Sequence, residues 1–264
     1  MAANNTYRID ILKVGEMSEV PSCSIRAMQD LERWEPFCYT CLVARTEGRT
    51  VVVNAGFPDD IETLVKFWSG LHPRCVLQRK NEYRVERQLE RLGIDPQKVQ
   101  HLIVNPLGPY STGKIDLFTH AALHLGRTAW LDFHAPSRNV PPSNPRELVF
   151  PAHVLRRLIF EDWPRVCLLE DEDEVCPGIR VFRAGAHHKG SLAIVIDTRQ
   201  GPVVYTDALF SYSNLERNIP MGFCRNIEEF YEAAKRIKTE AKIILPAFDP
   251  TLFEKYPEGR VVGA

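Results

Sequence analysis

Residues 99–111 read Val-Gln-His-Leu-Ile-Val-Asn-Pro-Leu-Gly-Pro-Tyr-Ser, and the fold is decided around this stretch. Its first half, residues 100–105, is mostly apolar and includes β-branched residues, which predicts a buried strand. Pro106, Gly108 and Pro109 follow at once, and these residue types end strands and form tight turns. The stretch therefore predicts a strand that stops in a turn.

Similar strand patterns recur on both sides of this stretch, and helical patterns lie between some of them. The further predicted strands cover residues 7–14, 38–45, 50–54, 128–131, 166–169, 179–183, 191–197, 202–205 and 241–245. The clearest helical patterns cover residues 60–69, 83–92 and 227–238. Residues 136–151, rich in Pro, Asn and Ser, predict an exposed loop. This order predicts a single domain, residues 1–264, with two mixed sheets packed together and helices outside.

The charge of the chain is balanced, with 33 Lys and Arg against 34 Asp and Glu. This balance gives no electrostatic reason to expect nucleic acid or an anionic membrane as a partner. No apolar run approaches the roughly 20 residues that cross a bilayer, and residues 1–14 lack the apolar core of a signal peptide. The seven cysteines are scattered and odd in number, unlike a disulfide framework. We therefore expect a cytoplasmic protein.

Several segments, taken in order, resemble the metallo-β-lactamase fold and in particular its acyl-homoserine lactonase-like branch. They are residues 48–56, 92–96, 99–104, 113–118, 184–197, 203–210, 214–216 and 244–250. The resemblance extends over most of the chain, and the order of so many pieces makes it more specific than any single motif. It implies an α/β fold, a four-layer αββα sandwich of two mixed β-sheets.

The resemblance also implies a metal motif at the end of the strand 100–105, and here the chain departs from the family. Enzymes of the family carry His-x-His-x-Asp-His at this place, because two adjacent zinc ions need several imidazoles and a carboxylate. The matching positions are Pro106, Gly108, Tyr110 and Ser111. The family's last histidine corresponds to Phe248. None of these five residue types is a good zinc ligand.

Two of the family's ligand positions keep a ligand residue, His187 and Asp207. The supporting aspartate of the early strand corresponds to Asn54, and His188 is expected to point away from its neighbour, as adjacent residues on an extended chain do. Three protein ligands are the usual minimum for zinc. We therefore expect no metal or other cofactor, with zinc at most weakly held at the remnant positions.

The candidate catalytic residues are those expected around the family's pocket. His187 and Asp207 either form an acid/base dyad or are relics held by packing. Tyr110, Ser111 and Lys114 are expected where the pocket opens, and Ser111 is a conceivable nucleophile although no Gly-x-Ser-x-Gly elbow surrounds it.

Three functions from different classes remain open. The first is a non-metal subunit in a complex with a metal-binding relative, or in a homo-oligomer, that acts on a small ester or lactone. The second is a stand-alone hydrolase or lyase that uses His187 and Asp207 without metal or with one weakly held ion. The third is a regulator that binds a small molecule in its cleft. The sequence alone identifies neither the substrate nor the partner.

Overall fold

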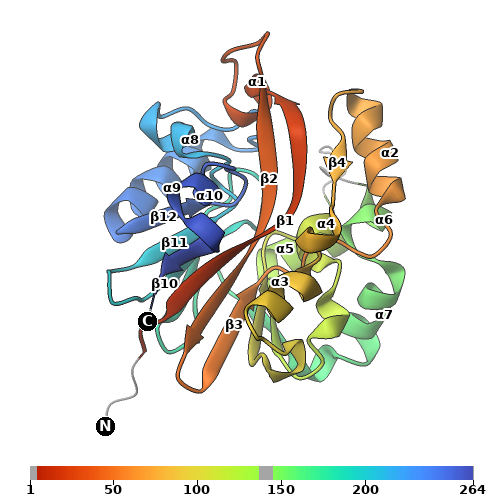
Figure 1. The fold of residues 1–264 in the computed structure, drawn as a ribbon, viewed down its shortest axis with the longest axis vertical. Helices are drawn as coiled ribbons and strands as arrows, with labels where there is room; N and C mark the ends of the chain where they lie inside the picture. Colours follow the sequence, from red (N-terminus) through yellow and green to blue (C-terminus); the bar gives the residue numbers. More distant parts are fainter. Residues whose placement is uncertain (1–4, 137–144, 264) are drawn as a thin grey trace.

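The computed structural model describes residues 5–136 and 145–263. Within them, two β-sheets lie face to face, and Figure 1 shows helices on the outer side of each sheet. Helices α2, α3, α5 and α7 cover one sheet, and α8, α9 and α10 cover the other. This is the four-layer αββα sandwich that the sequence predicts, and the fold prediction is confirmed.

The larger sheet has the strand order β13-β1-β2-β3-β5-β6-β7, with β4 paired to the free edge of β1 beside its bulge. Its strands are β1 Arg8–Pro21, β2 Trp34–Thr46, β3 Arg49–Val53, β4 Leu77–Gln78, β5 His101–Val104, β6 Ala122–Gly126, β7 Val166–Leu169 and β13 Arg260–Val262. Strands β3, β5, β6 and β7 are parallel, and β1, β2 and β13 form antiparallel pairs.

The smaller sheet has the order β12-β11-β10-β9-β8. Its strands are β8 Glu172–Cys176, β9 Ile179–Arg183, β10 Leu192–Ile196, β11 Val203–Thr206 and β12 Ile243–Pro246. All residues of β10 and β11 are buried, because one face of these strands meets the other sheet and the opposite face meets helices. Their apolar side chains belong to one continuous core.

The helices are mostly short. They are α1 Ser22–Ile25, α2 Glu62–Leu71, α3 Val85–Arg91, α4 Pro109–Thr112, α5 Arg127–His134, α6 Arg146–Val149, α7 Ala152–Phe160, α8 Tyr212–Glu216, α9 Ile227–Glu240 and α10 Leu252–Lys255. In α9 the buried residues are the four that the 3.6-residue period predicts: Phe230, Ala233, Ala234 and Ile237. Among the described helices, none has both the length and the apolar character that a membrane crossing requires.

Two local predictions need correction. Residues 128–131 form part of helix α5 and not a strand, because a short apolar run fits either period and Trp130 is buried here as a helical residue. The strand at this place is β6, Ala122–Gly126, which the sequence did not reveal. The predicted loop 136–151 contains helix α6, and its residues 137–144 lie outside the described residues.

Candidate functional site

The site is assembled where several strands end at one edge of the sandwich. Asp207 follows β11 directly, Asn105 follows β5, and His187 lies in the turn that joins β9 to β10. Because β10 is antiparallel to both β9 and β11, the turn before β10 and the end of β11 meet at the same edge. Residues that are far apart in the sequence therefore converge on Asp207.

The carboxylate of Asp207 is 1% exposed and is held from three directions. Ser191 Oγ donates to Oδ2 at 2.6 Å, and His187 Nδ1 lies 3.1 Å from the same oxygen. Asn105 Nδ2 donates to Oδ1 at 3.0 Å. These contacts fix the orientation of the carboxylate and of the His187 ring, as contacts around a metal or catalytic site commonly do.

His188 joins the same group, which corrects the expectation that it points away. Ligand atoms of His187, His188 and Asp207 all lie within 4.8 Å of one another. The two imidazole rings are 4.0 Å apart between centroids, because Gly185 and Ala186 take positive φ values of 57° and 61° and the chain bends here. Burial, with His187 and Arg225 nearby, holds the pKa of His188 well below its usual value, so the imidazole is neutral, as a metal ligand must be.

The turn itself is held by helix α9. Glu229 Oε2 accepts a hydrogen bond from the backbone N–H of Ala186 at 3.1 Å, and Glu229 Oε1 pairs with Arg183 at 2.8 Å. Gly185 has a φ of 57°, which favours glycine, and a Cβ atom here would lie 2.1 Å from the Glu229 carboxylate and would displace it from these contacts. The positions of both histidines therefore depend on a long-range contact.

At two of the family's other metal positions, Ser111 and Phe248 make hydrogen-bond and packing contacts within the protein. Ser111 is fully buried, and its one hydroxyl hydrogen is shared between the carbonyl oxygens of Pro106 and Gly108, while its oxygen accepts from the Gly108 N–H at 3.1 Å. It thus caps the first turn of α4. The ring of Phe248 stacks on Phe37, with 5.0 Å between centroids and 17° between planes.

Tyr110 projects from α4 toward the same region. Its side chain is 5% exposed, and its hydroxyl has no hydrogen-bond partner among the described residues. The ring meets Phe248 edge-on, with 5.4 Å between centroids and 88° between planes. Burial, together with the Asp207 carboxylate, raises the pKa of Tyr110 well above its usual value. The hydroxyl therefore stays protonated and remains a donor.

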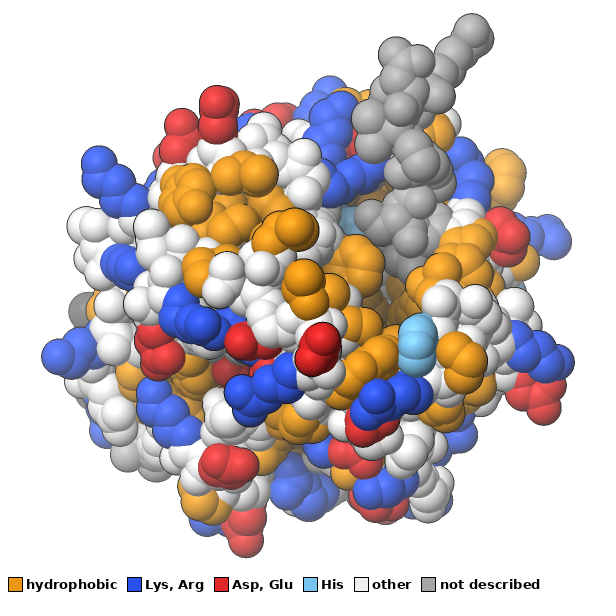
Figure 2. Space-filling model, turned by 90° about the horizontal axis from the view of Figure 1, so that it is seen from above, with side chains coloured by type: hydrophobic (Ala, Val, Ile, Leu, Met, Phe, Trp, Pro, Cys, Tyr) orange, Lys and Arg blue, Asp and Glu red, His pale blue; other side chains and the backbone are white. Residues whose placement is uncertain are grey.

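These groups lie at an aromatic cavity of about 680 Å³. The residues that line it are mostly apolar: Met17, Val20, Pro21, Ser24, Phe37, Tyr39, Phe67, Trp68, Leu71, His72, Cys75, Tyr110, His187, His188, Phe210, Gly222, Phe223, Cys224 and Phe248. Figure 2 shows apolar side chains gathered around a hollow on the face seen from above. Leu71 and Phe223 belong to the lining and are both largely exposed, which places them at the rim.

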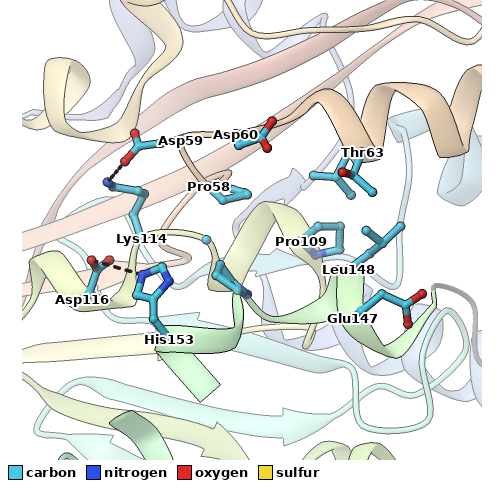
Figure 3. Close-up of a pocket in the computed structure, with 13 residues that line it drawn as sticks. Pro58, Asp59, Asp60, Thr63, Pro109, Lys114, Asp116, Glu147, Leu148 and His153 are labelled. Atoms are coloured by element: carbon cyan, nitrogen blue, oxygen red, sulfur yellow. Dashed lines mark hydrogen bonds and ion pairs between the residues drawn. The ribbon is translucent and has the colours of Figure 1, made fainter. Parts of the chain in front are cut away.

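Lys114 borders a second cavity, of about 450 Å³, which we call the polar cavity (Figure 3). Its Nζ lies 2.8 Å from Asp59 Oδ2, and His153 Nε2 lies 3.6 Å from Asp116 Oδ2 on the opposite wall. Of the three residues predicted at the pocket mouth, only Tyr110 lines the aromatic cavity. Lys114 lines the polar cavity, and Ser111 lies in the interior.

Beyond Tyr110 and Phe248, which stand at family metal positions, the sequence did not point to the aromatic rings that β2 and α2 contribute to the lining. Phe37 and Tyr39 come from β2, Trp68 from α2, and Phe210 from the segment after β11. The one available signal was the alternation of Phe37 and Tyr39, which places both rings on one face of a strand.

Comparison with known proteins agrees with this architecture. No protein-family model matches the chain. An N-acyl homoserine lactonase of Bacillus thuringiensis is 24% identical over 207 residues, which are 76% of each chain. An N-acyl homoserine lactonase of Bacillus cereus is 23% identical over 203 residues, 75% of this chain and 74% of that protein.

Solved structures show the same fold. An N-acyl homoserine lactone hydrolase with N-hexanoyl-L-homoserine at its catalytic metal centre superposes with a TM-score of 0.75 at 20% identity, over 95% of this chain and 96% of the other. A dizinc quorum-quenching lactonase gives a TM-score of 0.65 at 12% identity, over 95% and 88% of the two chains.

The expectation that the chain holds no metal or other cofactor is therefore wrong. It assumed that His188 points away, whereas the structure brings His187, His188 and Asp207 together as a group that suits a metal ion, and a structural relative carries two zinc ions. The order of the strands and the likeness to solved structures agree with the segments recognised in the sequence. The chain thus has the metallo-β-lactamase fold and resembles the acyl-homoserine lactonase-like branch of that superfamily.

Proposed function

We propose that the chain is a hydrolase for a small ester or lactone and that it works with one zinc ion. The observation that carries this proposal is the convergence of His187, His188 and Asp207 at the aromatic cavity, with ligand atoms within 4.8 Å of one another. Three protein ligands are the number that catalytic zinc sites use, since the remaining position is left for water or substrate.

The donor set fits one ion better than two. Two imidazoles and a carboxylate are preferred zinc ligands, and Ser191 and Asn105 already orient the carboxylate. At the family's other ligand positions, Pro106, Gly108 and Phe248 offer no side-chain ligand.

The chain's own residues then have separate tasks. Tyr110 donates its hydroxyl proton in a hydrogen bond to the acyl oxygen, where negative charge develops during attack. The aromatic lining holds the apolar part of the substrate and excludes water from it. When bound, a zinc ion would lower the pKa of a water molecule to near neutral and would polarise the substrate carbonyl. Overall, the hydroxyl of water joins the acyl carbon, the C–O bond to the alcohol breaks, and the proton ends on the leaving oxygen.

The test combines metal analysis with hydrolysis of a panel of neutral esters and lactones. Protein purified without chelator should contain about one equivalent of zinc, and His188→Ala should contain less than about a tenth. His153→Ala, in the polar cavity, is the matched control and should keep both zinc and activity. Activity should vanish in chelator and return with zinc. Turnover that is unaffected by chelator, or no turnover of any neutral substrate by zinc-loaded protein, would contradict the proposal.

We also propose that the chain associates with a second chain, either a metal-binding relative or another copy. The supporting observation is a set of exposed apolar side chains on α5, on α7 and just after α7: Leu131, Ile159, Phe160 and Trp163. Exposed apolar surface of this kind marks association sites. Light scattering should report a mass above 30.2 kDa, and Phe160→Ser should reduce it. A monomer at every concentration, alone and with a relative, would contradict this proposal.

A further inference from the structure

The lining of the aromatic cavity carries no fixed charge. Among the described residues that form it, none is Lys, Arg, Asp or Glu. The nearest carboxylate, Asp207, is buried behind the lining and is engaged by Ser191, Asn105 and His187. An ionised substituent on a ligand would lose its hydration in this cavity without gaining a partner, which is costly. The apolar part of the cavity therefore suits a neutral group.

The walls of the cavity are built from aromatic rings in both stacked and edge-to-face contacts. Tyr39 and Trp68 are parallel within 4°, with 5.6 Å between centroids. Phe210 meets Phe248 at 76°, with 4.9 Å between centroids. Rings of this kind gain about 0.5–1.5 kcal/mol from a further aromatic ring beyond the area that is buried. The walls therefore favour a planar aromatic group over a saturated group of the same size.

The polar end of the cavity offers one donor that the protein does not use. The Tyr110 hydroxyl is buried and lacks a partner among the described residues. Space beside it is kept by Gly108, where a Cβ atom would lie 3.2 Å from the Tyr110 ring and 3.6 Å from its hydroxyl. A buried donor without an acceptor is destabilising, and an acceptor on a ligand removes that cost.

From these observations we infer that the substrate is a neutral aryl-bearing ester or lactone, bound with its ring among Tyr39, Trp68 and Phe248 and its carbonyl oxygen on the Tyr110 hydroxyl. This inference rests on the proposed hydrolase function and names its substrate class. Tyr110 takes the place of a family metal ligand and uses that position to hold the substrate itself.

The experiment compares three γ-butyrolactones that differ in one substituent: phenyl, cyclohexyl and carboxyphenyl. Zinc-loaded protein should show a kcat/KM for the phenyl lactone about 2- to 12-fold above that for the cyclohexyl lactone, the range that ring stacking supplies. The carboxyphenyl lactone should be at least about tenfold poorer than the phenyl one. Equal rates for the phenyl and cyclohexyl lactones would overturn the inference.

Variants separate the two ends of the cavity. Tyr110→Phe should lower kcat/KM about tenfold or more for phenyl and cyclohexyl lactones alike, while the ratio between them is kept. Trp68→Leu should reduce that ratio. If this variant does not fold, Phe223→Leu at the exposed rim provides the same readout. Unchanged rates in Tyr110→Phe would also overturn the inference.

Binding without turnover distinguishes this inference from the proposed function. The phenyl and cyclohexyl lactams are not cleaved as esters are, and their effect on Tm reports binding alone. If no lactone is hydrolysed but the phenyl lactam raises Tm more than the cyclohexyl lactam, the hydrolase proposal fails and the ligand class stands. If lactones are hydrolysed without regard to the ring, the ligand class fails and the hydrolase stands.

Discussion

The aromatic cavity and the polar cavity both border the short helix α4, which contributes Tyr110 to the first and Pro109 to the second. In the polar cavity, charged side chains pair with one another. Lys114 and Arg84 pair with Asp59 and hold the pKa of its carboxyl below the usual value. In the aromatic cavity, the hydroxyl of Tyr110 has no partner among the described residues.

This difference between the cavities indicates which of them a ligand would complete. Buried polar groups in native proteins are almost always satisfied, and each exception calls for an explanation. In the polar cavity, Lys114 and His153 already pair with Asp59 and Asp116, although Oδ1 of Asp116 has no partner among the described residues, so a ligand there would compete with these pairs. The aromatic cavity has an unused donor and a group of three metal-ligand side chains, so binding there completes contacts that the protein leaves open.

The largest expected effect comes from exchanging one carboxylate for an amide in each cavity. Asp207→Asn should lower kcat/KM by about a thousandfold, roughly 4 kcal/mol, because the zinc site loses its only anionic ligand. Asp116→Asn, the matched change in the polar cavity, should stay within about twofold, because its partner His153 lies at the surface. Equal losses in both variants would erase the contrast between the cavities. Steady-state kinetics and zinc content provide the measurement.

Another unpartnered polar atom, Nδ1 of His124, lies outside both cavities. His124 Nε2 lies 3.0 Å from His101 Nδ1, and Nδ1 of His124 has no partner among the described residues. Burial and the neighbouring His101 lower the pKa of His124 to about 4, against a weak opposing effect of Asp173. Burial and Arg49 lower the pKa of His101 as well.

The sign of the resulting pH dependence follows from these pKa directions. Below about pH 6.5 the imidazole of His124 becomes protonated in the unfolded chain but stays neutral in the folded protein. The free energy of unfolding therefore falls as pH drops from about 6.5 to about 4. The contribution of His124 is at most about 3 kcal/mol. Denaturant unfolding at pH 7 and pH 4.5 should show a smaller difference in His124→Leu than in the natural protein. The same difference in both would contradict the assignment.

Two buried tyrosines provide a smaller effect of opposite sign. Tyr110→Phe should raise the free energy of unfolding by about 1 kcal/mol, because it removes a donor without a partner. Tyr205→Phe should lower it by a similar amount, because the Tyr205 hydroxyl donates to the Thr40 carbonyl at 2.9 Å and contacts Asn54 at 3.4 Å. Chemical denaturation of both variants is the test. A loss of stability in Tyr110→Phe would mean that its hydroxyl is satisfied after all.

The smallest expected effect is in the polar cavity. Lys114→Met should change the free energy of unfolding by less than about 1 kcal/mol, since its partner Asp59 is largely exposed and keeps Arg84. Activity should be unchanged, because Lys114 does not line the aromatic cavity. A loss of activity in Lys114→Met would show that α4 transmits changes from one cavity to the other.

The sequence predicts the sandwich because its strands carry strong local patterns in a characteristic order. The buried run 192–196 and the amphipathic pattern 227–238 are examples, and both elements form where they are predicted. The prediction for residues 128–131 is wrong because so short a run, Thr128 followed by three apolar residues, fits a helix or a strand equally well, and packing of Trp130 decides between them.

The site is less predictable because it depends on contacts that the sequence does not contain. His188 turns toward Asp207 only because Gly185 and Ala186 bend the chain, and that bend is held by Glu229, more than forty positions away in the sequence. Lys114 and Tyr110 are close in sequence but line different cavities. Family positions identified His187, Asp207, Tyr110 and Phe248, whereas the rings of Phe37, Tyr39 and Trp68 in the lining became visible only in three dimensions.

The pairing of β1 with β13 has a practical consequence. Ile9 and Val262 are neighbours in the larger sheet, and Figure 1 shows the first part of β1 low in the molecule near the C-terminus, with α1 at the top beside the aromatic cavity. An affinity tag or a surface anchor placed near Ile9 or Val262 would therefore leave the mouth of the cavity open to substrate, since it is the far end of β1, with Met17 and Val20, that lines the cavity. A short linker between the same two strands would suit a circular permutant, with its new ends opened in an exposed turn elsewhere.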